Sequence, residues 1–189
     1  QESRGLGDVY KRQVSSLLDN YSDLLCIGTV GDIVELKSEN RVFVKRGLVN
    51  IQESDRAGIN ALIETAGIAG KKITSGNVSF TLVPRINAVG RLGFSGKSVS
   101  LLLTDDENEA MSIAKQLNED NNERKEIEKN ILMKIDEMVK ANPHITNDRV
   151  LVIDGEGWHQ GVIGIVAAKV KEFFGKPTVI ICLLYTSPS

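Results

Sequence analysis

The sequence contains few cysteines and few histidines. Cys26 and Cys182 are the only cysteines among 189 residues, too few for a disulfide framework and without metal-binding spacing. This scarcity favours a reducing compartment, and we expect a cytoplasmic protein. His144 and His159 are the only histidines, and no Ser-His-Asp or Cys-His nucleophile set is recognisable. The common glycine-rich phosphate-binding motifs are absent as well.

Long apolar runs are also missing. No run approaches the roughly 20 residues that cross a bilayer, and no segment resembles a signal peptide. We therefore expect no membrane partner. The opening QESRGLGDVYKRQ (1–13) and the closing LLYTSPS (183–189) are typical of translated sequencing-adapter residues, so we expect the natural segment to comprise residues 14–182.

The composition is that of a globular protein, with 41% apolar and 25% charged residues and a net charge of −2. The charge is unevenly distributed. Residues 41–97 contain nine basic and three acidic side chains, whereas residues 98–142 contain six basic and eleven acidic ones. This pattern fits a polyanion partner confined to one groove. Chance clustering on a solvated surface explains it equally well.

Apolar spacing predicts helices in the first half of the chain. One face of a helix is formed by Val14, Leu17, Leu18, Tyr21, Leu24 and Leu25. We expect this helix to end before the glycine-bracketed turn GTVGD (28–32). The segment RVFVKRGL (41–48) suits either a strand or a helix. Ser54 is placed to cap a further helix that ends at Gly67.

A long helix is predicted next. The pattern from Thr104 to Glu107 is that of a capping box, and the helix it opens runs to about Ala141, near 35 residues and some 50 Å. Such a helix suits a connector between domains. Its apolar face comprises Ala110, Ala114, Leu117, Ile131, Ile135 and Met138, interrupted by Asn121, Arg124 and Glu128. The interruption indicates either a polar network between domains or a wet groove.

The last third of the sequence predicts a βαβ unit. Residues 150–154 form a continuous apolar strand, residues 162–174 a helix ending at Gly175, and residues 177–182 a second strand. A strand, a helix and a strand within about 33 residues indicate a parallel sheet. The fold class is therefore α/β.

Three stretches carry the candidate functional residues. In IGTVGDIVEL, Asp32 is either a helix N-cap or turn aspartate, or a carboxylate ligand for Mg²⁺ or Mn²⁺. In FTLVPRINAVGRLG (80–93), Arg85, Asn87 and Arg91 converge only if the chain bends, which Gly90 allows. The guanidinium groups of the two arginines would then each bind a phosphate through two hydrogen bonds, or else form interdomain salt bridges.

The third stretch is the loop GEGWHQG (155–161), between the predicted strand 150–154 and the predicted helix 162–174. Its glycines and the following helix N-terminus can face an anion. Trp158 could stack on a base or sugar and His159 could donate to a phosphate. The alternative is a buried tryptophan beside a surface histidine.

Four motifs occur in an order that resembles the RecJ family of the DHH phosphoesterase superfamily: IGTVGDIVEL, PRINAVGRLG, LNEDNNERKEIE and GEGWHQGVIGIVAAKV. Members of this family are 5′→3′ exonucleases specific for single-stranded DNA. The resemblance implies a two-lobed α/β fold. Residues 14–103 would be the C-terminal part of the DHH catalytic domain, residues 104–142 the connector helix, and residues 148–182 the first βαβ unit of the DHHA1 domain.

The resemblance also implies roles for individual residues. Asp32 would be a ligand of a two-metal site that holds Mn²⁺ or Mg²⁺. Single-stranded DNA would be contacted by Arg85, Asn87, Arg91, Asn121, Arg124, Trp158 and His159. Residues 41–48 would be helical.

The sequence departs from the family by lacking the Asp-His-His motif, the upstream aspartates, the glycine-rich end of DHHA1 and the OB-fold domain. We therefore expect these 189 residues alone to have no nuclease activity. Two alternatives remain open. One is a DHH/DHHA1 phosphodiesterase for short oligonucleotides or cyclic dinucleotides, and the other is a non-catalytic nucleic-acid-binding scaffold on the same fold.

Overall fold

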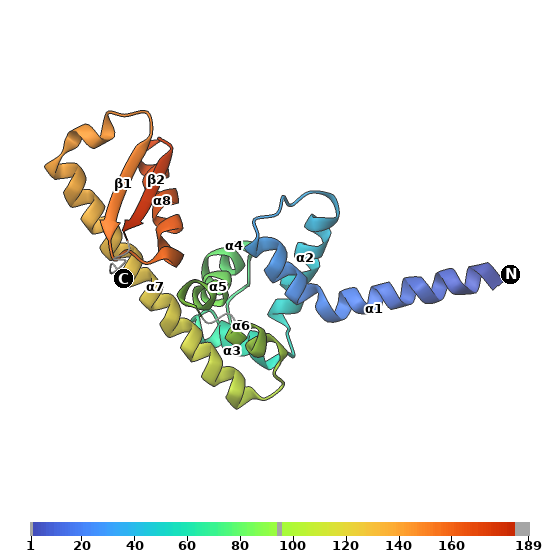
Figure 1. Ribbon diagram of the computed structural model, residues 1–189. Coiled ribbons are helices and arrows are strands. Elements are labelled where there is room, and N and C mark those ends of the chain that lie inside the picture. The colour runs from blue at the N-terminus through green and yellow to red at the C-terminus, as the bar shows by residue number, and fades with distance from the viewer. Residues whose placement is uncertain (1, 94–95, 184–189) are drawn as a thin grey trace, which may run out of the picture. The chain divides into compact units, whose positions relative to one another are not determined.

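A computed structural model describes residues 2–93 and 96–183, with side chains from residue 16 onward (Figure 1). The α-helices are α1 (Glu2–Gly31), α2 (Ser38–Gln52), α3 (Ala57–Thr65), α4 (Ser75–Asn77), α5 (Val83–Leu92), α6 (Gly96–Leu103), α7 (Glu107–Ala141) and α8 (Gln160–Phe174). The other elements are the π-helix η1 (Val78–Leu82), the 3₁₀-helix η2 (Pro143–Thr146) and the strands β1 (Leu151–Glu156) and β2 (Thr178–Leu183). None of the described helices is both long and apolar enough to cross a membrane.

The chain divides into two compact units. Residues 2–89 and 96–118 belong to the first, and residues 90–93 and 119–183 belong to the second. Each unit has its own apolar core. Helices α5 and α7 each contribute residues to both.

Helix α1 differs from its sequence prediction in two ways. It continues through Gly31 and does not stop before residue 28. Its buried face is also a different one: Leu17, Tyr21 and Leu25 are 56%, 51% and 39% exposed, whereas the buried positions are Ser22, Asp23, Cys26, Ile27, Thr29 and Val30. Val14 of the predicted face lies outside the residues whose side chains are described. Apolar spacing was therefore a poor guide here, because the partners of α1 determine which face is covered.

One of those partners is α2, which approaches α1 closely at Gly47. A Cβ atom at this position would lie 2.1 Å from the carbonyl oxygen of Ser22 and 2.3 Å from Cβ of Cys26. Only glycine permits this contact. The Cys26 side chain is fully buried as a result, and burial, followed by the charge of Asp23, raises the pKa of its thiol to about 11. The helical form of residues 41–48, implied by the resemblance, is confirmed.

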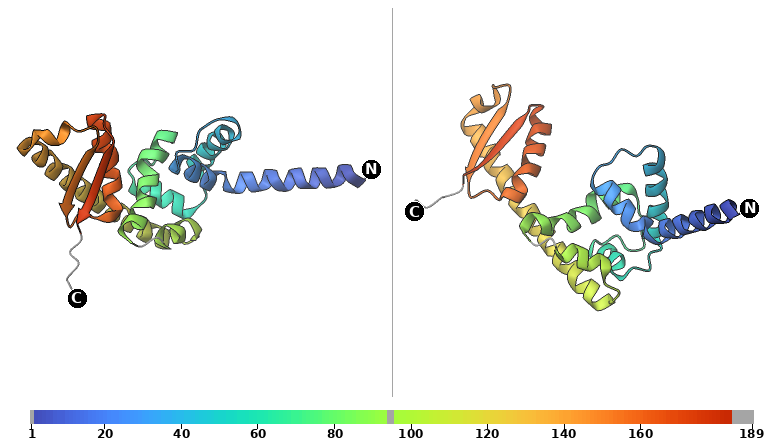
Figure 2. Two further views of the ribbon diagram at one scale, coloured as in Figure 1. Left: turned by 45° about the horizontal axis from the view of Figure 1, so that its top comes forward. Right: turned by 45° about the vertical axis from the view of Figure 1, so that its right-hand side comes forward.

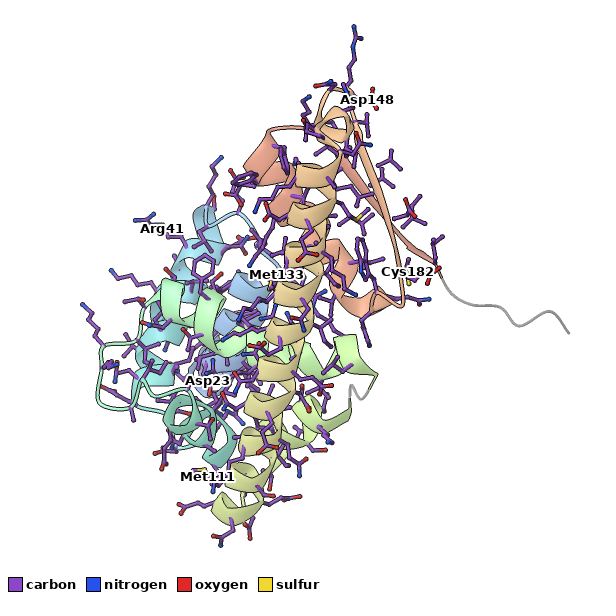
Figure 3. All side chains as sticks on the ribbon, turned by 90° about the vertical axis from the view of Figure 1, so that its left-hand side faces the viewer. Asp23, Arg41, Met111, Met133, Asp148 and Cys182 are labelled. Carbon is purple, nitrogen blue, oxygen red and sulfur yellow. The ribbon has the colours of Figure 1, made fainter. Side chains whose placement is uncertain are left out.

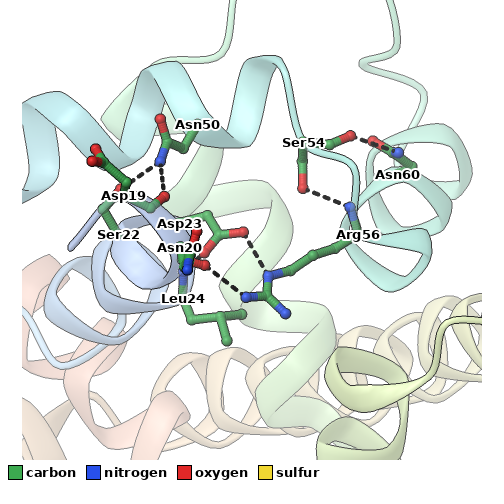
Figure 4. Close-up of polar contacts among 9 residues, drawn as sticks. All are labelled: Asp19, Asn20, Ser22, Asp23, Leu24, Asn50, Ser54, Arg56 and Asn60. Carbon is green, nitrogen blue, oxygen red and sulfur yellow. Dashed lines mark hydrogen bonds and ion pairs between the residues drawn. The ribbon is translucent and has the colours of Figure 1, made fainter. Parts of the chain in front are cut away.

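A buried ion pair joins α1 to the start of α3 (Figure 4). Nε of Arg56 donates to Oδ2 of Asp23 at 2.9 Å, and the Asp23 side chain is only 7% exposed. Arg56 also lies over the Tyr21 ring, 5.3 Å from its centroid. Ser54 does not cap α3, because its hydroxyl accepts from the backbone N–H of Arg56, the residue before the helix.

Helix α7 begins differently from the prediction but follows it in length and phase. Asp106 caps the helix, since its Oδ1 accepts from the backbone N–H of Glu109 at 2.8 Å. The Thr104 hydroxyl bonds to Glu109 and to the N–H of Asp106, so a capping box with Glu107 does not form. The predicted face is buried at Ala110, Ala114, Leu117, Asn121, Glu128, Ile131 and Ile135.

The second unit contains the predicted βαβ arrangement. Strands β1 and β2 are parallel, with Leu151 opposite Thr178, and α8 connects them. Gly175 ends α8 with a left-handed φ of 65°. Figure 2 shows α8 along one side of the two strands. The second core consists of residues from the last part of α7, β1 and α8, whereas Val152 and Ile181 on the opposite face of the sheet are exposed. A small parallel sheet with helices confirms the α/β class.

Candidate nucleic-acid interface

The candidate metal ligand, Asp32, lies immediately after α1. Its backbone N–H donates to the carbonyl of Gly28 at 3.0 Å, and its side chain is exposed. The residue that precedes α2 is Lys37, so the N-cap interpretation of Asp32 is wrong and the turn interpretation remains. A carboxylate at a helix C-terminus faces the negative end of the helix dipole. A cation bound there would therefore be stabilised by both the carboxylate and the helix.

The backbone beside Asp32 is strained. Ile33 has φ 55°, a left-handed conformation that is costly for a β-branched residue. Two hydrogen bonds hold it there: its own N–H donates to Val30 O at 3.2 Å, and the N–H of Val34 donates to Thr29 O at 3.1 Å. This is a Schellman motif, which normally has glycine at the left-handed position. These two hydrogen bonds hold the turn that places Asp32 at the end of α1.

Arg85 is half-buried in the first unit. Its Nε donates to Oδ1 of Asn118 at 3.1 Å and its Nη1 to the carbonyl of Thr81 at 2.6 Å. Both acceptors are neutral, and within the described residues no carboxylate pairs with this guanidinium. Burial lowers the pKa of Arg85. An approaching anion would raise this pKa again, because it stabilises the charged guanidinium. Arg85 is thus held in place by two neutral acceptors, and its charge remains uncompensated.

The helix that carries Arg85 begins with a π turn. The N–H of Val83 donates to the carbonyl of Val78, five residues earlier. Pro84 follows, and it has no N–H to continue an α-helical ladder and would crowd the carbonyl of Phe80. The wider π turn accommodates this proline. The sequence Val-Pro-Arg thereby sets the position from which Arg85 projects.

Arg91 lies at the other end of α5, in the second unit. Its Nη1 donates to the carbonyl of Gly161 at 3.2 Å, and it pairs with no carboxylate in the described part of the chain. Gly161 is required here, because a Cβ atom would lie 2.1 Å from Arg91 O. Helix α5 remains helical through Gly90, so the bend expected there is absent. Asn87 is exposed on the same helix.

The polar interruption of α7 is a hydrogen-bonded network in the second unit. Nη1 of Arg124 donates to Oε2 of Glu128 at 2.9 Å, and Lys169 of α8 pairs with the same carboxylate. Nε and Nη2 of Arg124 donate to Oδ1 of Asn121 at 3.3 and 3.2 Å. The amide nitrogen of Asn121 is buried without a partner in the structure. The interruption thus forms a polar network, but this network lies within the second unit and not between domains as predicted.

Trp158 and His159 have different environments. Trp158 is only 5% exposed within the second core, so its ring offers no free face for a base and the stacking hypothesis is wrong for this structure. Its carbonyl accepts from the thiol of Cys182 at 2.7 Å. Cys182, labelled in Figure 3, lies near the end of β2. His159 caps α8, with Nδ1 accepting from the N–H of Gly161 at 3.1 Å.

Several partners of these residues were not found from the sequence. Asn118 is 33 residues from Arg85, and Lys169 is 41 residues from Glu128. Asn118 lies in LNEDNNERKEIE and Lys169 in GEGWHQGVIGIVAAKV, but spacing within one motif does not predict a partner in another, so only the folded chain reveals these contacts. Among the described residues, no cluster of three or more histidine, cysteine or acidic side chains could hold a metal. Asp32 would thus be a single ligand that needs others from outside this sequence.

Comparison with known proteins decides the relationship. The single-stranded-DNA-specific exonuclease RecJ of Thermus thermophilus is 37% identical over 161 residues, which cover 85% of this chain and 23% of that protein. RecJ of Bacillus subtilis is 32% identical over 184 residues, 96% of this chain and 23% of that protein. This chain is homologous to part of RecJ. The resemblance read from the four motifs is confirmed.

Solved RecJ structures agree with the sequence relationship. The crystal structure of Thermus thermophilus RecJ in complex with Mn²⁺ matches with a TM-score of 0.77 and 35% identity, over 87% of this chain and 24% of that one. The structure of the same RecJ with Mg²⁺ gives a TM-score of 0.75. The chain thus spans about a quarter of the length of the RecJ proteins that it matches. No protein-family model matches it.

Proposed function

We propose that this chain is part of a metal-dependent exonuclease that degrades single-stranded DNA from its 5′ end, in recombination and repair. Homology to RecJ supports this proposal. The observation in the structure that carries it is the uncompensated charge of Arg85. A half-buried guanidinium, held by Asn118 and Thr81 but without a carboxylate, is prepared to bind an anion such as a DNA phosphate.

The two units would then be parts of the two lobes. Residues 14–103 would belong to the DHH catalytic domain, residues 104–142 would form the connector, and residues 148–182 would open the DHHA1 domain. Asp32 would supply one oxygen ligand to Mn²⁺ or Mg²⁺, the metals bound in the RecJ structures. Bound divalent cations stabilise the negative charge that develops on oxygens of the phosphodiester during hydrolysis. The role of Arg85 would be to orient the strand.

The experiment uses a RecJ-length protein that carries this sequence. We expect it to release nucleotides from the 5′ end of single strands when Mn²⁺ or Mg²⁺ is present, and expect Asp32→Asn to abolish cleavage while strand affinity is retained. The 189-residue chain alone should not cleave. Near-normal cleavage by the Asp32→Asn variant at saturating metal would show that Asp32 is not a metal ligand.

Arg85 is tested by salt titration of single-strand binding. Arg85→Ala should lower the log–log salt slope by about 0.7, the value for one lost phosphate contact. Arg56→Ala is the matched control, because the charge of Arg56 is already neutralised by Asp23. It should lower the melting temperature and leave the salt slope unchanged. An unchanged slope for Arg85→Ala would show that Arg85 is architectural.

A further inference from the structure

Arg85 is held by a side chain to which the family resemblance gave no role. Asn118 comes from α7, and its Oδ1 accepts from Nε of Arg85 at 3.1 Å. Both residues belong to the first unit, so this contact joins α5 to α7 within it. The carbonyl of Thr81 holds Nη1 of the same guanidinium. Within the described residues Nη2 donates to no acceptor, so this nitrogen can still receive an anion.

The amide of Asn118 is an exception among the side chains that contact arginine. Three other guanidinium groups contact a side-chain oxygen in the described ranges, and each meets a carboxylate: Arg46 with Asp19, Arg56 with Asp23, and Arg124 with Glu128. Carboxylates are frequent on α7 too, and Glu119 and Asp120 directly follow Asn118. An uncharged acceptor therefore faces Arg85 from a helix that is otherwise rich in acidic residues.

An amide can do for Arg85 what a carboxylate cannot. Either oxygen accepts a hydrogen bond from a guanidinium and so fixes its orientation. A carboxylate also neutralises the charge, and a phosphate would then compete with it for the same cation. An amide leaves the charge available to an anion. Early ordering matters as well, because a side chain that is fixed before binding avoids an entropy cost equivalent to roughly two- to tenfold in affinity.

We propose that Asn118 is a positioning residue, which orients Arg85 toward a phosphate of the substrate and leaves the charge of Arg85 uncompensated. The proposal rests on the proposed function, in which Arg85 binds that phosphate. It adds α7 of the first unit to the elements that determine how strongly the site attracts an anion. It also separates two properties of Arg85, its orientation and its available charge, which two different substitutions of Asn118 remove one at a time.

The two substitutions are compared by salt titration of single-strand binding, in the RecJ-length protein without divalent metal so that the strand stays intact. Asn118→Asp places a carboxylate against Arg85, so affinity should fall and the log–log salt slope should decrease in magnitude by about 0.7, as for Arg85→Ala. The double variant of Arg85→Ala and Asn118→Asp should lose no more slope than either single variant. Asn118→Leu removes the acceptor and keeps the charge, so affinity should fall about two- to tenfold with the slope unchanged.

Gln116→Glu is the matched control for the added negative charge. Gln116 is exposed on the same helix, and two residues turn an α-helix by about 200°, so its side chain points away from that of Asn118. This variant should keep the wild-type salt slope. Thermal unfolding of the 189-residue chain, followed by circular dichroism, provides a second measurement. Asn118→Asp should raise the melting temperature through its new ion pair although it weakens binding, whereas a residue that only supported the fold would change both in the same direction.

Three results would overturn the role of Asn118. One is a full salt slope in Asn118→Asp when Arg85→Ala has lost its share, and another is an equal loss of slope in Gln116→Glu. The third is a lower melting temperature in Asn118→Asp, since unfolding would then account for weaker binding. An unchanged slope in Arg85→Ala would refute the role of Arg85 and that of Asn118 with it. Failure of the proposed function is thereby distinguished from failure of the positioning role alone.

Discussion

The buried carboxylate of Glu128 makes a sharp prediction about stability. Its side chain is 8% exposed and receives Arg124 of the same helix and Lys169 of α8. In Glu128→Ala, Lys169 can turn to water because it is 54% exposed. The Arg124 side chain is only 11% exposed, so its guanidinium cannot turn to water without leaving its packed position. The variant therefore leaves a largely buried guanidinium with only the Asn121 oxygen as a partner.

The expected loss follows from this geometry. Removing one partner of a buried ion pair costs about 3–5 kcal/mol of the free energy of unfolding. The bonds from Arg124 to Asn121 remain, so we expect about 3 kcal/mol, the low end of that range. Asp136→Ala is the matched control. Asp136 pairs with Lys140 at the same spacing on the same helix, but these side chains are 60% and 73% exposed, so water replaces the lost partner and the loss should be much smaller.

The assay is urea unfolding followed by Trp158 fluorescence, which reports the second unit because the chain has one tryptophan. Equal losses in Glu128→Ala and Asp136→Ala would refute the reasoning, since burial is the property that distinguishes the two pairs. A loss below about 1 kcal/mol in Glu128→Ala would show that water reaches Arg124.

Two further predictions concern close packing and burial. Gly161→Ala should lower the melting temperature, because the new Cβ atom would meet Arg91 O. Gly164 has open space around it, so Gly164→Ala should instead stabilise α8 by up to about 1 kcal/mol. Equal melting temperatures of the two variants would contradict this prediction. The pKa of Cys26 is about 11 in the folded chain against an ordinary value of 9.0, so the unfolded chain ionises first and stability should fall as pH rises from about 9 to about 11. Cys26→Ala should lack this alkaline loss in urea titrations, and an identical loss in both proteins would show that another group causes it.

The features that sequence predicted correctly are those with strong local patterns. The face of α7 was found because its apolar spacing extends over 35 residues, and the βαβ unit was found because apolar strands flank a helix ended by Gly175. The buried face of α1 was not found. Burial there depends on Gly47 of α2 and on Arg56, which neutralises Asp23. A pattern within one helix contains no information about such partners.

The starts of helices were predicted poorly for a related reason. Several side chains near a helix start can accept the same backbone N–H groups, and small differences in backbone angles select among them. Asp106 caps α7 although Thr104 has the better motif, and Ser54 bonds to Arg56 without capping α3. The motif indicates that a helix begins nearby, and the structure identifies the residue.

The arginines show why the candidate site needed the folded chain. Counted along the sequence, every arginine between residues 41 and 97 adds equally to the local positive charge. In the structure, Arg46 pairs with Asp19 and Arg56 with Asp23, so their charges stabilise the contacts of α1. Arg85 has only neutral oxygens as partners, and burial has already removed part of its water. Because desolvation makes a remaining charge interact more strongly with an anion, Arg85 is the arginine from which a DNA phosphate would gain most.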